Sequence, residues 1–434
     1  MRKSVAIVGG GIAGLSAAHR LADEAAVTLF EREPYAGGHA NTIVVEEGAR
    51  TLGIDTAFVV FNARTYPQLS SFFADLGVQA KDHRGGFNFF DLDTGLDYGT
   101  AELDLDEAEV TARYPDRFVS LWREARRFHD EAPKDFLRQR TNVPLGDYLD
   151  ERGYSDDFKY GYVVLLATAV WSVPAELIWE MPATTVIAFY MSHDQEALGG
   201  RTIAWKTVDG GSRSYVRAIL DRLGDGVVLD TPVRSVTEVA DGVEVVTDGG
   251  THRFDQVIVA THADTALELI GEPTARQREI LGTVRYSATR AILHTDPAVM
   301  PVDRSRWASW NYGRVTKDGT PRPWVAYYMN SLQGFEAEQD YFVTLDCPIE
   351  PAPETVIREI ACTHPVIDLP VRQMQKGIQS VNKEGRIKLA GSYFHAPKIG
   401  LDLIGSHEAG HVSGLLAAEA VLRDLDESSA RRTA

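Results

Sequence analysis

The sequence predicts an α/β fold in which a parallel-sheet domain, assembled from three separated pieces of the chain, is interleaved with an α+β domain. Three observations lead to this prediction. An apolar run, a glycine-rich turn and a helical pattern follow one another at residues 5–21. Two later apolar runs, residues 257–261 and 387–390, would add strands to the same sheet. Residues 290–346 instead indicate antiparallel strands.

Size, charge and cysteine content limit the possible classes of protein. A chain of 434 residues that is 44% hydrophobic can bury a large core and form two or three domains. Its net charge of -18 disfavours binding to nucleic acid or anionic lipid. Cys347 and Cys362 form no CxxC pair, which supports neither a disulfide framework nor a zinc site. The longest apolar stretch, residues 160–173, is too short to cross a bilayer. We therefore expect a cytoplasmic protein with no metal and no integral membrane segment.

The glycine-rich turn after the first strand has the spacing of a dinucleotide-binding motif. Gly9, Gly11 and Gly14 follow the GxGxxG pattern, which permits a tight turn, a close approach of a diphosphate and close packing of helix on strand. Ile12 and Ala13 would open the helix, whose first N–H groups and positive dipole end point at the phosphates.

A second strand, residues 27–30, ends in an acidic residue. Glu31 is in the place where a carboxylate accepts the ribose hydroxyls of a bound dinucleotide, and Arg32 follows it. Because NAD and FAD share this arrangement, it does not choose between the two cofactors. A surface position for Glu31 is the alternative.

The next residues favour FAD. Gly37 and Gly38 follow the acidic residue closely, which resembles the extended fingerprint of flavoproteins. In the amine oxidase and phytoene desaturase superfamily an arginine usually comes next, whereas this chain has His39. That histidine would touch the diphosphate or be an ordinary loop residue.

The resemblance to this superfamily covers the whole chain and implies a Rossmann-like FAD-binding domain. It implies a backbone contact of Val233 with the adenine, a strand that ends at Ala260, and a C-terminal strand and helix that face the flavin ring. The further positions expected at the cofactor are Thr56, Ala57, Phe58, Gly391, Ser406, His407 and Glu408. For His407 and Glu408 we expect mainly backbone N–H contacts, with helix capping as an equal alternative for their side chains.

The resemblance also implies how the chain is divided. We expect residues 1–60, 205–265 and 380–423 to form the FAD-binding domain, residues 61–204 and 266–379 to form the substrate domain, and residues 424–434 to be a disordered tail. Segments such as residues 286–312 look like a bacterial subgroup of FAD-binding, amine-oxidase-like proteins that often accompany cyclopropane fatty acid synthases.

Two positions weaken the expectation of amine oxidation. Amine oxidases commonly hold the substrate nitrogen between two aromatic side chains, but here Ser406 takes one position and the strand expected near residues 371–381 has no aromatic residue. A lysine of the family is matched by Arg290, which cannot act as a base. Arg290 would anchor a substrate carboxylate, stabilise reduced flavin or lie on the surface.

Aromatic residues on the expected antiparallel strands would line the substrate pocket. Because side chains alternate along a strand, Trp310 and Tyr312 should share one face, and Tyr327 and Tyr328 should point in opposite directions. Arg290, Trp310 and Tyr327 are therefore our candidates for residues next to the reacting atoms.

The sequence therefore predicts an FAD-dependent dehydrogenase or oxidase that abstracts hydride from a C–H bond of a largely apolar small molecule, an acyl chain or a specialised metabolite. The chain has no second GxGxxG element, so dioxygen or another acceptor would reoxidise the flavin, or the hydride would return in an isomerisation. An amine or amino acid oxidase that releases peroxide is one alternative. A non-catalytic flavoprotein partner of a lipid-modifying enzyme is another, and a homodimer is possible.

Overall fold

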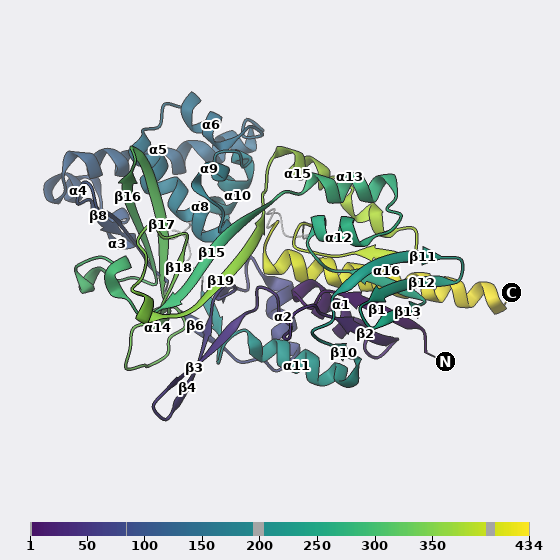
Figure 1. The fold of residues 1–434 in the computed structure, drawn as a ribbon. Coiled ribbons are helices and arrows are strands. Elements are labelled where there is room, and N and C mark those ends of the chain that lie inside the picture. The colour runs from purple at the N-terminus through teal and green to yellow at the C-terminus, as the bar shows by residue number, and fades with distance from the viewer. Residues whose placement is uncertain (1, 84, 194–203, 396–403, 434) are drawn as a thin grey trace.

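The computed structural model describes residues 2–83, 85–193, 204–395 and 404–433. A five-stranded sheet combines strands from three distant parts of the chain (Figure 1). All neighbouring strands in it are parallel. Their order is β10 (Val227–Val228), β2 (Ala26–Phe30), β1 (Ser4–Val8), β14 (Gln256–Val259) and β20 (Ile387–Leu389). The predicted α/β class is confirmed.

Both faces of this parallel sheet are covered, which explains why β1 is apolar at successive positions. Val5 and Ile7 share a core with the helices on one face, and Ala6 and Val8 share a core with an antiparallel sheet on the other. The helices are α1 (Ile12–Leu21), α11 (Arg213–Leu223) and α16 (His407–Thr433). The antiparallel sheet consists of β11 (Val233–Val239), β12 (Gly242–Thr247) and β13 (Gly250–Phe254).

A seven-stranded sheet forms the centre of the other half of the molecule (Figure 1). Its neighbouring strands are antiparallel except for one parallel pair, β16 with β7. The order is β19 (Val356–Pro365), β15 (Tyr286–His294), β18 (Phe342–Leu345), β17 (Thr320–Tyr328), β16 (Trp310–Lys317), β7 (Phe87–Asp91) and β8 (Asp97–Gly99). The antiparallel strands expected between residues 290 and 346 are present, whereas the sequence did not reveal that β7, β8 and β19 complete the sheet.

Helices cover one face of this sheet, and buried aromatic side chains such as Phe118, Phe128 and Tyr148 fill the layer between the helices. The longest is α5 (Asp116–Leu137). The others are α3 (Thr100–Leu103), α4 (Glu107–Arg113), α6 (Leu145–Glu151), α7 (Asp156–Phe158), α8 (Val164–Trp171), α9 (Ala175–Ile178) and α10 (Ala183–His193).

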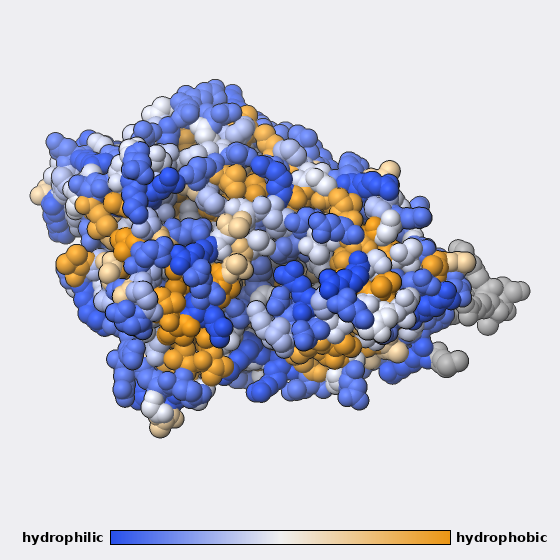
Figure 2. Space-filling model, viewed as in Figure 1, coloured by the Kyte–Doolittle hydropathy of each residue, from blue (hydrophilic) through white to orange (hydrophobic). Residues whose placement is uncertain are grey.

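Short elements connect the two halves. Two small sheets contain β3 (Thr42–Glu47) with β4 (Arg50–Asp55), and β5 (Val60–Phe61) with β9 (Trp205–Val208) and β6 (Ala80–His83). The connecting helices are α2 (Pro67–Asp75), α12 (Ala263–Leu269), α13 (Ala275–Thr283), α14 (Met329–Leu332) and α15 (Leu369–Met374). Most of the face shown in Figure 2 is hydrophilic, as expected for a highly charged chain.

The strand expected near residues 371–381 is absent from the structure, which has helix α15 and a 3-10 helix (Ile378–Asn382) there. Asp368 starts α15 because its carboxylate accepts a hydrogen bond from the N–H of Val371. Pro370 stands in the first turn, where a proline costs no hydrogen bond.

The prediction of a disordered tail from residue 424 is also wrong, because α16 continues to Thr433. The first residues of this segment are held in place by packing and by charge. Leu425 is buried, and Asp424 accepts a hydrogen bond of 2.6 Å from the fully buried Lys388 ammonium group of β20. Among the described residues, no helix is both long enough and apolar enough to cross a membrane.

We expect Lys388→Met to lower the free energy of unfolding by about 3 kcal/mol, because the substitution leaves Asp424 and the carbonyl oxygen of Gly385 without their buried partner. Chemical denaturation of the FAD-loaded protein measures this change. As a control, Lys134→Met removes an exposed ion pair with Asp130 and should cost less than about 1 kcal/mol. Equal effects of the two substitutions would contradict the assigned role of Lys388.

Candidate active site

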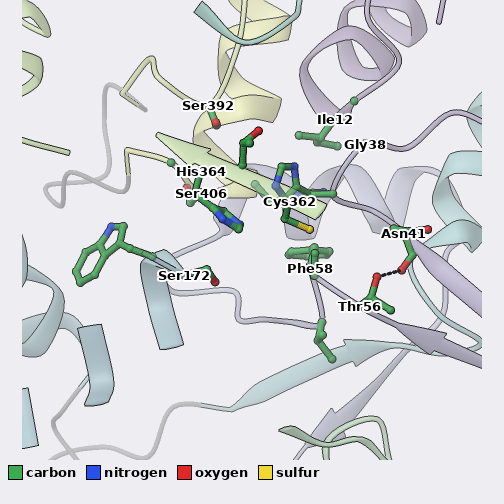
Figure 3. Close-up of a pocket in the computed structure, with 18 of the residues that line it drawn as sticks. Ile12, Gly38, Asn41, Thr56, Phe58, Ser172, Cys362, His364, Ser392 and Ser406 are labelled. Carbon is green, nitrogen blue, oxygen red and sulfur yellow. Dashed lines mark hydrogen bonds between the residues drawn. The ribbon is translucent and has the colours of Figure 1, made fainter. Parts of the chain in front are cut away.

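A cavity of about 1510 Å³ lies between the parallel sheet and the seven-stranded sheet. Figure 3 shows side chains that enter it from several elements. Ile12 and Gly38 lie on one side and Ser172 lies on the opposite side, with Phe58 and Cys362 between them. The cavity therefore brings together the two halves of the molecule and most of the residues expected at the cofactor.

The three glycines of the opening motif occupy positions with different spatial requirements. Gly9 has a φ of +106°, and a Cβ there would stand 2.8 Å from the carbonyl oxygen of Ala260. A Cβ on Gly14 would stand 1.9 Å from the carbonyl oxygen of Gly9. A Cβ on Gly11 would meet no atom within 4 Å, and Gly11 lines the cavity with Ile12. Gly14 thus serves packing, whereas Gly11 leaves open space at the N-terminus of α1.

The glycine pair that follows Glu31 closes over this turn. The N–H of Gly37 donates to the carbonyl oxygen of Gly10 at 2.8 Å, and Gly37 has a φ of +133°. Gly38 lines the cavity, and a Cβ on it would lie 3.2 Å from the Cα of Gly11. Gly37 itself is a structural neighbour of the cavity and does not line it.

Glu31 stands at the carboxyl end of β2 and lines the cavity together with Arg32. Its carboxylate accepts hydrogen bonds from the N–H of Gly10 at 2.6 Å and the N–H of Glu33 at 3.0 Å. Val233 and Ala260 line the same end of the cavity, at the start of β11 and just after β14. The expected ribose and adenine positions therefore lie together.

The other end of the cofactor region is lined by Thr56, Ala57, Phe58, Gly391, Ser406 and His407. The ring of Phe58 stacks on that of His407 with centroids 3.9 Å apart, and the hydroxyl group of Tyr215 lies 2.7 Å from Nε2 of His407. Burial, followed by repulsion from His39, lowers the pKa of His407 to about 3, so its side chain is neutral. Ser406 caps α16 by accepting a hydrogen bond from the N–H of Ala409 at 3.1 Å.

Glu408 does not line the cavity, and the capping alternative holds for its side chain. Its carboxylate accepts hydrogen bonds from the N–H groups of Gln68 and Leu69 at 3.0 and 2.8 Å. These groups belong to the first turn of α2, where backbone donors lack partners within the helix. Glu408 thus joins α16 to α2 and makes no side-chain contact at the cavity.

Three histidines gather around the cavity near the expected diphosphate. The ring of His39 lies 4.9 Å from that of His364 and 6.4 Å from that of His262, measured between centroids. Burial and mutual repulsion lower the pKa of His39 to about 4 and that of His364 to about 3. Nε2 of His39 and Nδ1 of His364 are buried and find no hydrogen-bond partner in the described part of the chain. These orphaned atoms are suited to a polar ligand.

The sequence offered no signal for His262 or His364. His364 follows charged residues on β19, a strand that the apolar pattern does not reveal. His262 is the N-cap residue of α12, shortly after β14, and its Nδ1 lies 3.2 Å from the hydroxyl oxygen of Thr363. The pairing of β15 with β19 positions His364 beside His39, whereas His262 comes from the segment between β14 and α12.

Trp310, Tyr312 and Tyr327 all line the cavity, as the alternation along β16 and β17 predicts. Tyr328 points to the other side of the sheet, where its ring lies 5.4 Å from that of Trp307. Burial raises the pKa of Tyr327 above its usual range, although a hydrogen bond with Ser172 opposes this shift. Tyr327 is therefore a neutral hydroxyl at neutral pH.

Arg290 is not at the cavity, so its proposed place beside the reacting atoms is wrong. Its guanidinium group binds Glu359 and Glu350 at 2.8 Å each, and its side chain is 42% exposed. The neighbouring Thr289 takes the inward position on β15 and donates a hydrogen bond of 2.7 Å to the carbonyl oxygen of Ser172. The surface alternative for Arg290 is confirmed by this geometry.

Comparison with known proteins relates the chain to a family and to solved structures of similar fold. The sequence profile of the family described as flavin containing amine oxidoreductase matches residues 12–318. No curated protein matches the chain. Cyclohexylamine oxidase from Brevibacterium oxydans IH-35A has a similar fold, with a TM-score of 0.69 and 16% identity over 98% of this chain and 100% of that one.

Two further solved structures are similar in fold. Putrescine oxidase bound to putrescine gives a TM-score of 0.66 at 16% identity and covers 98% of this chain and 99% of that one. A fatty acid isomerase from P. acnes, described as CLA-producing, gives 0.63 at 14% identity over 97% of this chain and 98% of that one. The similar fold therefore serves substrates of different chemistry.

The glycines provide a paired test of the site. Gly14→Ala should lower the free energy of unfolding by about 3 kcal/mol, because its Cβ has no room. Gly11→Ala should change it by less than about 0.5 kcal/mol, because Gly11 has a φ of -74° that alanine adopts and no atom crowds its Cβ. Its methyl group should nevertheless prevent the approach of a diphosphate. Thermal unfolding and the FAD content of purified protein measure both effects, and a Gly11→Ala variant with normal FAD content would contradict the assignment.

Proposed function

The chain belongs to the flavin-containing amine oxidoreductase family, and on that premise we propose that this FAD-dependent oxidoreductase abstracts hydride from a C–H bond of a largely apolar small molecule. The observation that supports the proposal most is the composition of the cavity wall away from the glycine-rich turn. Aromatic and aliphatic side chains form it, among them Phe87, Leu103, Trp171, Phe189, Trp310 and Leu332. Such a wall suits an acyl chain or another apolar metabolite.

The residues at the other end of the cavity fit FAD. The open space at Gly11 and the first N–H groups of α1 suit a diphosphate, and Glu31 stands where a ribose would need an acceptor. The first backbone N–H groups of α16 would face the pyrimidine side of the ring, near Ser406 and His407. Bound flavin supplies an acceptor for hydride at its N5 atom.

The chain's own contribution is to position the substrate and to exclude water. Tyr327 stays neutral and Arg290 is turned outward, so neither residue supplies an ionised group at the cavity. Loss of a hydride leaves the donor carbon positively charged, so a dehydrogenation must also release a proton to water or another acceptor, whereas an isomerisation returns the hydride to the substrate. The apolar wall therefore suits a substrate that is uncharged before it reacts.

Amine oxidation is the second candidate, and one observation favours it. Tyr393 lines the cavity, and its hydroxyl group has no hydrogen-bond partner among the described residues. An aromatic side chain thus reaches the cavity even though Ser406 takes the position where amine oxidases commonly have another. Family membership favours both enzymes over a non-catalytic flavoprotein partner.

We expect anaerobic addition of apolar acyl compounds to bleach the flavin of the FAD-loaded protein, or to give an isomer detectable by chromatography. Absorbance spectra with medium-chain acyl compounds, n-alkylamines and amino acids compare the candidate reactions. Arg290→Gln should behave like the unchanged protein in this assay, because Arg290 lies outside the cavity. Bleaching by amines alone would contradict the proposal and establish the second candidate.

The histidines predict a pH dependence of FAD affinity. His39, His262 and His364 are neutral in the FAD-free protein because burial lowers the pKa of each ring, with Arg32 opposing and Asp264 favouring a charge on His262. A diphosphate dianion would raise these pKa values, so binding takes up protons. FAD affinity should then increase as the pH falls from about 8 to about 5.5, by up to about tenfold per pH unit for each proton taken up.

Fluorescence titration of FAD into the FAD-free protein measures this dependence. His39→Gln keeps a polar side chain but cannot take up a proton, so the affinity of this variant should change less with pH. An affinity that is the same across the pH range in the unchanged protein would contradict the assignment of these rings to the diphosphate.

A further inference from the structure

The apolar part of the cavity contains a histidine that no step described above uses. His83 ends β6, lines the cavity and is 8% exposed. Its ring meets that of Trp310 edge to face, with centroids 5.5 Å apart. A Cβ on Gly85 would stand 2.8 Å from the Trp310 ring, so a glycine at this position leaves room for that ring.

The two nitrogens of this ring have different surroundings. Burial lowers the pKa of His83, and an interaction with the backbone of Ser331 opposes this shift. Nε2 has no hydrogen-bond partner in the described part of the chain. In the neutral tautomer whose proton is on Nδ1, Nε2 presents its lone pair as an acceptor.

A buried acceptor of this kind is costly without a donor, because it has lost its bond to water. The charged groups close to it in sequence are engaged elsewhere: Asp82 binds Lys206 at 2.9 Å, and Lys81 binds Asp209 at 3.1 Å. An ammonium group at Nε2 would thus have to compete with Lys206 for the neighbouring carboxylate of Asp82. A neutral hydroxyl group supplies the missing donor without a charge.

We propose that Nε2 of His83 binds a hydroxyl group of the substrate, so that the substrate is an apolar molecule carrying a hydroxyl group. This inference rests on the proposed function and narrows its substrate class. His83 would act as a specificity residue: it orients the apolar molecule in the cavity through one hydrogen bond, and Trp310 packs against the same region.

The test compares two probes of nearly equal size, 1-octanol and 1-methoxyheptane, of which only the alcohol can donate a hydrogen bond. Binding to the FAD-loaded protein is followed by perturbation of the flavin absorbance and by calorimetry, and neither needs turnover. The unchanged protein should bind the alcohol about tenfold more tightly than the ether. n-Octylamine at neutral pH should bind no more tightly than the ether.

Three variants separate recognition from structure. His83→Phe fills the space of the ring but removes the acceptor, so the preference for the alcohol should fall to less than about twofold while the ether still binds. His83→Gln keeps an acceptor oxygen and should bind the alcohol within about threefold of the unchanged protein. His294→Phe is the matched control, because Nε2 of His294 is also buried and orphaned but does not line the cavity. It should keep the full preference.

Equal binding of the two probes by the unchanged protein, including no binding of either, would overturn the inference, as would a preference that survives His83→Phe. Tighter binding of the amine than of the alcohol would also overturn it. Failure of the proposed function gives a different result, namely protein without FAD or flavin that no apolar compound reduces. If His83→Phe does not fold, the binding of the two probes to the unchanged protein and to His83→Gln still tests whether His83 binds a hydroxyl group.

Discussion

The close contact between the N-terminal helix α1 and the C-terminal helix α16 is the constraint on which the rest of the structure depends. A Cβ on Gly414 would lie 2.1 Å from the carbonyl oxygen of Ala13, and a Cβ on Gly410 would lie 2.8 Å from the side chain of Ile12. The two glycines are one helical turn apart and share a face. The hydroxyl group of Ser16 and Nδ1 of His411 add a buried hydrogen bond of 2.8 Å. This contact brings the N-terminal ends of both helices to one wall of the cavity.

The cavity has different chemistry at its two ends because these ends come from different parts of the fold. Helix N-termini, Glu31 and neutral histidines stand at the parallel sheet, where a charged dinucleotide would be held. Aromatic side chains of β16 and β17 form much of the opposite wall. Binding and reaction are thereby separated: the polar end suits the cofactor, and the apolar end suits a substrate with few polar groups.

The parallel sheet and the cofactor were predictable from the sequence because local patterns encode them. The apolar run of β1 and the spacing of Gly9, Gly11 and Gly14 have direct physical reasons in the structure. The faces of Trp310, Tyr312, Tyr327 and Tyr328 followed from strand alternation.

Features that depend on distant contacts were not predictable in this way. Arg290 points outward because its neighbour Thr289 points inward. Matching Arg290 to the lysine of the family does not reveal which of the two side chains faces the cavity. The start of the C-terminal segment is anchored because Asp424 pairs with Lys388 of β20, which is distant in sequence. The environment of His364 exists only after β19 pairs with β15.

The most direct test of the account is a crystal structure of the FAD-loaded protein. It should show the diphosphate at Gly11 and the ring facing the wall that contains Trp310 and Tyr327; a ring that faces solvent or the histidines, away from that wall, would contradict the account.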